Sequence, residues 1–189
     1  MPRSDDLYAL PPGLPRPVDD GAADHLVGLR LPAKPLAATR GEQATLADQP
    51  GWLVIYCFPR TGQPDVEPLA GWNAIPGARG CTPQSCGYRD LHAELQQLGV
   101  VVFGLSTQTP AYQREAAVRL GLPFALLSDE GHEVLDALSL PEFEVEGTRL
   151  LRRLTLICRN GRIEHVRYPV FPPDADAAES LAWLETQRA

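Results

Sequence analysis

Short apolar runs alternate with helical patterns between residues 52 and 138, and few folds fit that order. Runs of strand length, rich in β-branched and aromatic residues, are expected as buried strands at 52–58, 100–107 and 124–129. Apolar residues spaced three and four apart predict helices at about 82–98, 112–120 and 132–138. Because strands that alternate with helices pair in parallel through right-handed crossovers, we expect a parallel sheet here.

An Asn-Gly pair at 160–161 marks the end of that alternation. This dipeptide is the strongest short hairpin signal, and it joins two strand-like runs, 149–158 and 162–170. An antiparallel pair should therefore close the sheet, and a smaller hairpin is expected to turn at Arg40 and Gly41. The predicted fold class is α/β, with a central mixed β-sheet flanked by helices on both faces.

The chain is expected to hold one domain preceded by an arm. Its 189 residues suit a single compact domain, and a hydrophobic content of 44% is ample for the core. Residues 1–22 combine prolines with acidic residues, a composition that buries no core, so we expect an extended arm or disordered lead there and the domain at 23–189. A helix at 174–187, capped by Asp174 or Asp176, should end the domain.

The net charge limits the classes of binding partner, and the cysteine content bears on the cellular compartment. A net charge of −7 leaves no basic surplus for nucleic acid or an anionic membrane, so small molecules or proteins are expected. No apolar run approaches the roughly 20 residues of a membrane span, and the first residues lack the apolar core of a signal peptide. We therefore expect a cytoplasmic protein. Because thiols stay reduced there, its four cysteines should form no structural disulfide framework.

Two of the cysteines lie in the stretch GARGCTPQSCGYRD, residues 77–90. Cys81 comes just before Thr82 and Pro83, and proline is favoured in the first turn of a helix. The unpaired backbone donors of a helix N-terminus favour a thiolate there. A free thiol with a pKa of about 8.5 is already about 3% ionised at pH 7, so full ionisation raises reactivity only about 30-fold. Fast chemistry would also need donors placed on the substrate's developing charge.

Cys86 cannot reach Cys81 while the helix is intact. Five residues of α-helix separate the two Cα atoms by roughly 8.5 Å, whereas a disulfide needs less than about 7 Å. A bond between them would require the first turn to unwind, which the neighbouring Gly87 makes easier. Two other interpretations stay open: both thiols could be small buried hydrophobes, or they could bind a metal, although the four histidines show no matching cluster.

Three segments, YCFP at 56–59, GCTPQSCGYRDLHAEL at 80–95 and VVVFGLST at 100–107, resemble the peroxiredoxins of the bacterioferritin-comigratory or Q type. The resemblance runs from about residue 25 to the C-terminus. It implies a thioredoxin-like fold of the AhpC/TSA-like kind and thiol-dependent reduction of hydrogen peroxide and alkyl hydroperoxides. It implies no cofactor and no metal.

The same resemblance assigns roles to individual residues. Cys81 matches the peroxidatic cysteine, and Cys86 matches the resolving cysteine that forms an intramolecular disulfide with it, which thioredoxin or a similar dithiol protein then reduces. Family members also place an arginine in the strand before the final hairpin. Alternation along a strand lets only one of Arg152 and Arg153 face the site, and the family's Arg-x-Ser/Thr pattern favours Arg153.

The peroxide-binding part of the motif is where the sequence departs from the family. Ala78 stands where the family has a threonine, and an insertion follows the strand-ending Pro59. Pro59 and Thr82 are the expected substrate contacts, and Thr61, Thr82 or a water could supply the missing hydroxyl. Trp72, inside the insertion, could cover the site or cap an exposed patch.

Several features separate the peroxidase from its rivals. A thiol-disulfide oxidoreductase on the same fold usually carries Cys-x-x-Cys, and a thioredoxin-like copper carrier would have Cys-x-x-x-Cys with a matching histidine.

The remaining cysteines, Cys57 and Cys158, lie in apolar strands and are expected to be inert packing. Arg89 and Asp90 match the family's Arg-Asp pair, or form a local ion pair on a solvated face. We expect a monomeric or weakly associating protein.

Overall fold

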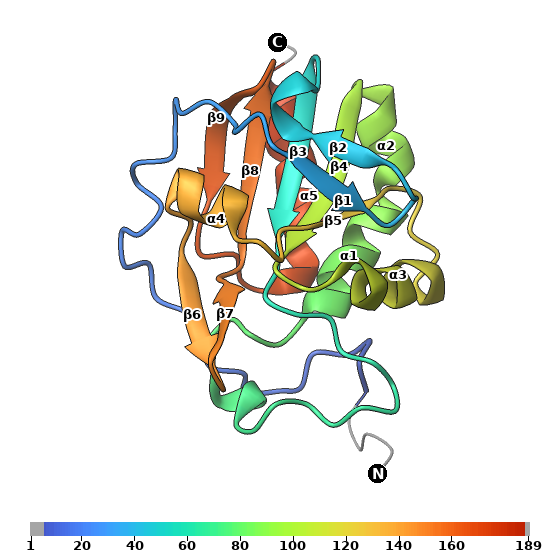
Figure 1. Cartoon of the computed structure of the whole chain (residues 1–189), viewed down its shortest axis with the longest axis vertical. Helices are drawn as coiled ribbons and strands as arrows, with labels where there is room; N and C mark the ends of the chain where they lie inside the picture. The colour runs from blue at the N-terminus through green and yellow to red at the C-terminus, as the bar shows by residue number, and fades with distance from the viewer. Residues whose placement is uncertain (1–5, 188–189) are drawn as a thin grey trace.

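The computed structural model describes residues 6–187, and a seven-stranded mixed sheet forms its centre (Figure 1). The sheet has the order β2-β1-β5-β4-β3-β8-β9. Its strands are β1 (Pro35–Ala38), β2 (Gln43–Thr45), β3 (Trp52–Cys57), β4 (Val100–Ser106), β5 (Leu126–Ser128), β8 (Leu154–Arg159) and β9 (Arg162–Arg167). Strand β3 pairs in parallel with β4 and antiparallel with β8, and β4 pairs in parallel with β5. The expected mixed sheet is therefore confirmed.

The helices cover both faces of the sheet, but unequally. They are α1 (Cys81–Asp90), α2 (His92–Gln97), α3 (Pro110–Arg119), α4 (Glu133–Leu138) and α5 (Asp176–Thr186). Because β3, β4 and β5 follow one another in the same direction across the sheet, right-handed crossovers place α1, α2 and α3 on the same face. Helix α5 joins them there, and Figure 1 shows α4 in front of the sheet with α5 behind it.

Two apolar clusters fill the space on either side of β3. Val54 and Tyr56 face the cluster under α1, α3 and α5, where Tyr56 stacks on Tyr88 with ring centroids 4.5 Å apart. Their neighbours Leu53 and Ile55 point to the opposite cluster under α4. All four side chains are buried, as expected for a central strand that is covered on both faces. No helix of the described residues is long and apolar enough to cross a membrane.

The predicted helix at 82–98 is two helices, because the backbone bends at Leu91, where ψ is 12°. Helix α1 packs against α5 and the 3-10 turn Pro173–Ala175, whereas α2 packs against β4. A straight helix could not lie along both surfaces. The bend therefore follows from tertiary packing. The residue at the bend is neither proline nor glycine, so the sequence does not indicate a kink there.

A second hairpin, outside the main sheet, was not expected from the sequence. Strands β6 (Glu142–Val145) and β7 (Thr148–Leu151) form a separate two-stranded sheet that turns at Glu146 and Gly147, both with positive φ. The run 149–158, predicted as one strand, is consequently interrupted at residues 152–153 between β7 and β8.

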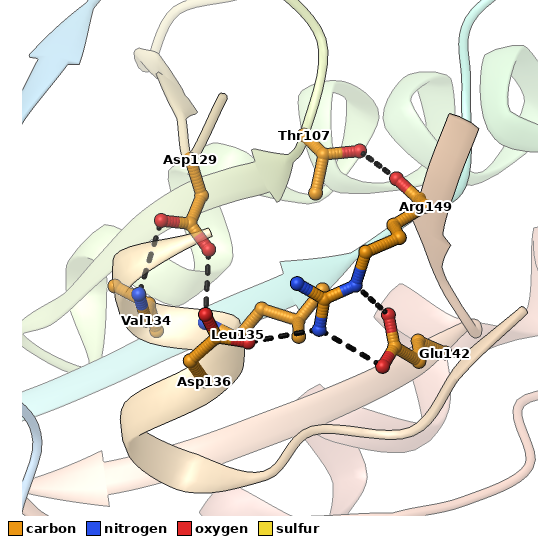
Figure 2. Close-up of polar contacts among 7 residues, drawn as sticks. All are labelled: Thr107, Asp129, Val134, Leu135, Asp136, Glu142 and Arg149. Carbon is orange, nitrogen blue, oxygen red and sulfur yellow. Dashed lines mark hydrogen bonds and ion pairs between the residues drawn. The ribbon is translucent and has the colours of Figure 1, made fainter. Parts of the chain in front are cut away.

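Polar contacts attach this hairpin to the domain (Figure 2). Arg149 in β7 pairs with Asp136 at 2.8 Å and Glu142 at 2.7 Å, which joins the hairpin to α4. Thr107 Oγ1, just after β4, donates to the Arg149 carbonyl at 2.9 Å. The start of α4 is held by Asp129, whose carboxylate accepts the backbone N–H groups of residues 134 and 135. The hairpin is thus fixed beside the break that carries Arg153.

The described part of the N-terminal arm runs without helix or strand from residue 6 to residue 22. It lies against the loop before α1: the Arg79 guanidinium donates to the carbonyl of Asp6, and Leu7 is buried. Further along, the Arg16 guanidinium lies over the Phe171 ring. The predicted turn at Arg40 and Gly41 is confirmed by the antiparallel pairing of β1 with β2.

Candidate active site

Cys81 is the first residue of α1, and the glycine before it makes that position possible. Gly80 has a φ of 106°, in the left-handed region that favours glycine. A Cβ at Gly80 would lie 2.6 Å from Pro173 Cγ and 2.9 Å from Leu10 Cδ2. The chain can therefore make this close approach only with glycine, and Cys81 begins the helix with its side chain buried.

The Arg153 guanidinium lies over the Cys81 sulfur. Its Nη2 donates to Cys81 Sγ at 3.2 Å and to the carbonyl oxygens of residues 77, 78 and 79, also at 3.2 Å each. Arg152 points elsewhere, because it donates to the Glu142 carbonyl and lies over the Phe143 ring. Of the two predicted candidates, only Arg153 reaches the sulfur, and it does so from the break before β8 rather than from within a strand.

Arg153 is a buried cation, and the Cys81 sulfur is one of its few partners. Arg153 is only 3% exposed, and among the described residues no carboxylate forms an ion pair with it. Apart from the sulfur, its partners are backbone carbonyls and the side-chain oxygen of Gln84. A buried cation without a counter-charge is costly, so these hydrogen bonds are what stabilises the Arg153 guanidinium in its place.

A pocket opens beside Cys81, and the arm, the insertion and α3 all contribute to its wall. The wall includes Leu7 from the arm, Trp72 from the insertion and Tyr112 from α3, along with Arg60 and Arg79. Trp72 lines the pocket and packs against Leu150 in a small buried apolar cluster, so it caps no exposed patch.

Of the two expected substrate contacts, Thr82 lines the pocket and Pro59 does not. Thr82 and Thr61 both line the pocket, whereas Pro59 is buried and lies outside the lining. The Thr61 hydroxyl donates to Gln108 Oε1 at 3.2 Å, and no side chain or backbone group in residues 6–187 bonds the Thr82 hydroxyl. Thr82 is thus the better-placed free hydroxyl. The Ala78 side chain lies outside the pocket lining, because it packs in the apolar cluster with Trp72, and this residue takes part in the site only through its backbone carbonyl.

Cys86 lies on the same helix, half-buried and not bonded to Cys81. Burial raises the pKa of the Cys86 thiol, and the nearby guanidinium of Arg89 opposes that shift. Arg89 itself pairs with Asp90 at 2.8 Å, the local ion pair that the sequence left open. In the folded helix, Cys86 is therefore a protonated thiol that becomes more nucleophilic once it is exposed.

Behind Arg153 lies a polar network that the sequence did not reveal. Gln84 is fully buried and joins Arg153 to the carboxylate of Asp176, at the start of α5. The expectation that Asp174 or Asp176 caps this helix is wrong. The cap position is Ala175, and the Asp176 side chain points into the protein, where Thr155 and Tyr88 donate to it. Nothing in the local sequence distinguishes an inward carboxylate from a capping one.

The other two cysteines lie in the sheet. Cys57 and Cys158 are fully buried in the apolar cluster on the face opposite α1, and burial raises the pKa of both thiols. Among residues 6–187, no group of three or more histidine, cysteine, aspartate or glutamate side chains is placed to hold a metal ion.

Comparisons with known proteins agree with this site. The Redoxin family model matches residues 26–181. Peroxiredoxin Bcp of Escherichia coli K12 is 35% identical over 136 residues, which are 67% of this chain and 74% of that protein. The chloroplastic peroxiredoxin Q of Oryza sativa subsp. japonica is 32% identical over 107 residues, 57% of this chain and 49% of that protein. The chain thus spans about half the length of the plant relatives it matches.

Solved structures show the same fold. The Xanthomonas campestris bacterioferritin comigratory protein, described for its alkyl peroxide reduction activity, superimposes with a TM-score of 0.66. The match has 24% sequence identity and covers 85% of this chain and 98% of that one. The expected thioredoxin-like fold is therefore confirmed.

Proposed function

This chain belongs to the redoxin family, and within it to the peroxiredoxins named Q and Bcp, and from this we propose that it is a thiol peroxidase. Its substrates would be hydrogen peroxide and alkyl hydroperoxides. The observation that supports this most directly is the contact of 3.2 Å between Arg153 Nη2 and Cys81 Sγ at the start of α1, beside an open pocket. The contact combines a stabilised nucleophile with a donor for the charge that develops on the leaving oxygen.

In the first step, the Cys81 thiolate attacks the terminal oxygen of the hydroperoxide. A sulfur–oxygen bond forms, the oxygen–oxygen bond breaks, and the leaving alkoxide or hydroxide takes a proton to become an alcohol or water. Cys81 is left as a sulfenic acid. The Arg153 guanidinium can follow the negative charge from sulfur to oxygen without moving far, and Thr82, at the pocket wall, can donate to the peroxide.

In the second step, the Cys86 thiol loses its proton and attacks the sulfenic sulfur. A sulfur–sulfur bond forms, the sulfur–oxygen bond breaks, and the leaving hydroxide takes a proton to become water. Residues five apart on an intact helix are too distant for this bond, by roughly 1.5 Å between Cα atoms. The first turn of α1 must therefore unwind, which would also expose Cys86 and remove the burial that keeps it protonated.

A dithiol protein, thioredoxin or a similar reductant, would then reduce the Cys81–Cys86 disulfide through a mixed disulfide. We place the protein in the cytoplasm, where such reductants are kept reduced. We also propose that it acts as a monomer, since each group named in the two steps comes from one chain.

Stopped-flow mixing of the reduced protein with hydrogen peroxide tests this function, with mass analysis of the product. The wild type should lose two hydrogens and form a Cys81–Cys86 bond, because both thiols are consumed. Cys81→Ser should consume no peroxide. Cys86→Ser should complete one fast turnover, stop at the sulfenic acid and fail to recycle with thioredoxin. Full turnover by Cys81→Ser would contradict the mechanism, and tight stoichiometric copper binding without peroxide turnover would favour a copper carrier.

A further inference from the structure

We propose that Asp176 is a positioning residue for the reaction of Cys81, because it fixes Gln84, which in turn holds the Arg153 guanidinium over the sulfur. This inference rests on the proposed peroxidase function and extends it to a residue that touches neither the sulfur nor the pocket. Asp176 lies on α5, and 95 positions of sequence separate it from Cys81.

The connection is an unbroken series of hydrogen bonds. Arg153 donates through Nη2 to the Cys81 sulfur and through Nη1 to Gln84 Oε1. Gln84 Nε2 then donates to Asp176 Oδ2 at 2.8 Å. Gln84 and Asp176 are fully buried and Arg153 is 3% exposed, so water cannot replace any of these contacts. The order of the Arg153 side chain therefore depends on the order of Gln84.

The carboxylate decides which way the Gln84 amide faces. An amide carries a donor and an acceptor of almost the same shape, and only its partners select one orientation. Arg153 can only donate, and the Asp176 carboxylate can only accept. Gln84 satisfies both when Nε2 faces Asp176 and Oε1 faces Arg153, as in the structure. With a neutral amide in place of Asp176, the opposite orientation would become available and would place an NH₂ group against the guanidinium.

Asp176 is well suited to this role because several elements hold it still. Thr155 Oγ1 from β8 donates to Oδ2 at 2.7 Å, and the Tyr88 hydroxyl from α1 donates to it at 3.0 Å. Burial raises the pKa of Tyr88, so its hydroxyl keeps the proton that it donates. Arg167 from β9 forms an ion pair with Oδ1 at 3.2 Å. A purely structural role is the rival interpretation, since these contacts also join α5 to the sheet.

The test uses Asp176→Asn, with two reactions of Cys81 as readouts. We expect the second-order rate with hydrogen peroxide and the alkylation rate with iodoacetamide each to fall about tenfold, because Arg153 loses its fixed orientation. Ser180→Ala is the matched control. It removes a buried hydroxyl of α5 that bonds the Tyr88 hydroxyl at 3.0 Å and leaves the Gln84 contact in place, so both rates should stay within about twofold of wild type.

A double-mutant cycle separates positioning from folding. If Asp176 acts through Arg153, then Asp176→Asn should cause no further loss of alkylation rate in an Arg153→Ala background. An equal loss in both backgrounds, or no loss in either, would overturn the proposal. If Asp176→Asn does not fold, Gln84→Leu breaks the same connection and should give the same loss. Alkylation by iodoacetamide does not depend on peroxide reduction. A wild-type protein whose Cys81 is alkylated quickly but does not reduce peroxide would therefore contradict the proposed peroxidase function, and the positioning role of Asp176 would still be tested by the alkylation rates.

Discussion

The guanidinium of Arg153 donates a hydrogen bond to the sulfur of Cys81, which lies 72 positions earlier in the sequence. It also donates to three backbone carbonyls in the loop before α1. One side chain thus contacts both the loop and the Cys81 sulfur. The contact depends on the planar fork of an arginine, whose several N–H donors point in fixed directions.

Arg153→Lys should therefore lower kcat/KM for hydrogen peroxide by about 100-fold, since an ammonium cannot keep the carbonyl contacts while it reaches the sulfur. Arg152→Lys is the matched control, because the neighbouring arginine donates to Glu142 and lies over Phe143. It should react at the wild-type rate. Steady-state peroxidase assays on both variants test the expectation, and equal rates for the two would remove Arg153 from the mechanism.

Gly80→Ala should destabilise the fold by about 3 kcal/mol, from a left-handed backbone and from a Cβ that overlaps Pro173 and Leu10. Gly41→Ala separates the two causes. Gly41 also has a positive φ, of 88°, but nothing lies within 4 Å of the place a Cβ would take there, so about 1 kcal/mol should be lost. Urea unfolding of both variants gives the free energies, and similar losses would show that the close approach at Gly80 relaxes freely.

The stability should fall at alkaline pH because of Cys57 and Cys158. Burial raises the pKa of both thiols in the folded protein, so only the unfolded chain releases their protons near its thiol pKa of about 8.5. The unfolded state then binds fewer protons, and the free energy of unfolding decreases as pH rises. Each thiol contributes a slope of about 1.4 kcal/mol per pH unit above that value. This stabilisation is complete below about pH 8.5.

Urea unfolding under reducing conditions, between neutral pH and about pH 9.5, measures this slope. A Cys57→Ala/Cys158→Ala protein is the control. It should be less stable at every pH because cavities form, but most of the alkaline slope should disappear. A slope that persists unchanged in that protein would assign it to other groups.

Thr82→Val should reduce kcat/KM for hydrogen peroxide by about tenfold, because it removes the unbonded hydroxyl from the pocket wall. Thr82→Ser keeps the hydroxyl and should restore most of the rate. Ala78→Thr should not rescue Thr82→Val, although it recreates the family's residue, because side chain 78 packs with Trp72 and Leu150 rather than in the pocket. Rescue by Ala78→Thr would show that the loop can turn residue 78 toward the peroxide.

Local patterns were enough to predict the elements whose structure is set by nearby residues. The buried strands β3 and β4 follow from their apolar runs. The β8–β9 hairpin follows from Asn160 and Gly161, both of which have the positive φ that such a turn needs. The position of Cys81 at a helix start followed from Pro83, two residues later.

What the sequence did not reveal depends on contacts between distant segments. The bend at Leu91 exists because α1 and α2 pack on different surfaces. Arg153 was identified through the family resemblance, but its place outside any strand depends on the β6–β7 hairpin. Asp176 looked like a helix cap because its partners, Gln84, Tyr88 and Thr155, lie far from it in the sequence. Neither propensity nor spacing carries such information.

The arm also matters for anyone who produces this protein. Leu7 forms part of the pocket wall and Leu10 lies next to Gly80, so the described start of the arm lies beside the Cys81 sulfur. The last turns of α5 lie at the other end of the long axis in Figure 1. A purification tag or fluorescent fusion is therefore best joined after residue 189, where it leaves the entrance to the pocket clear.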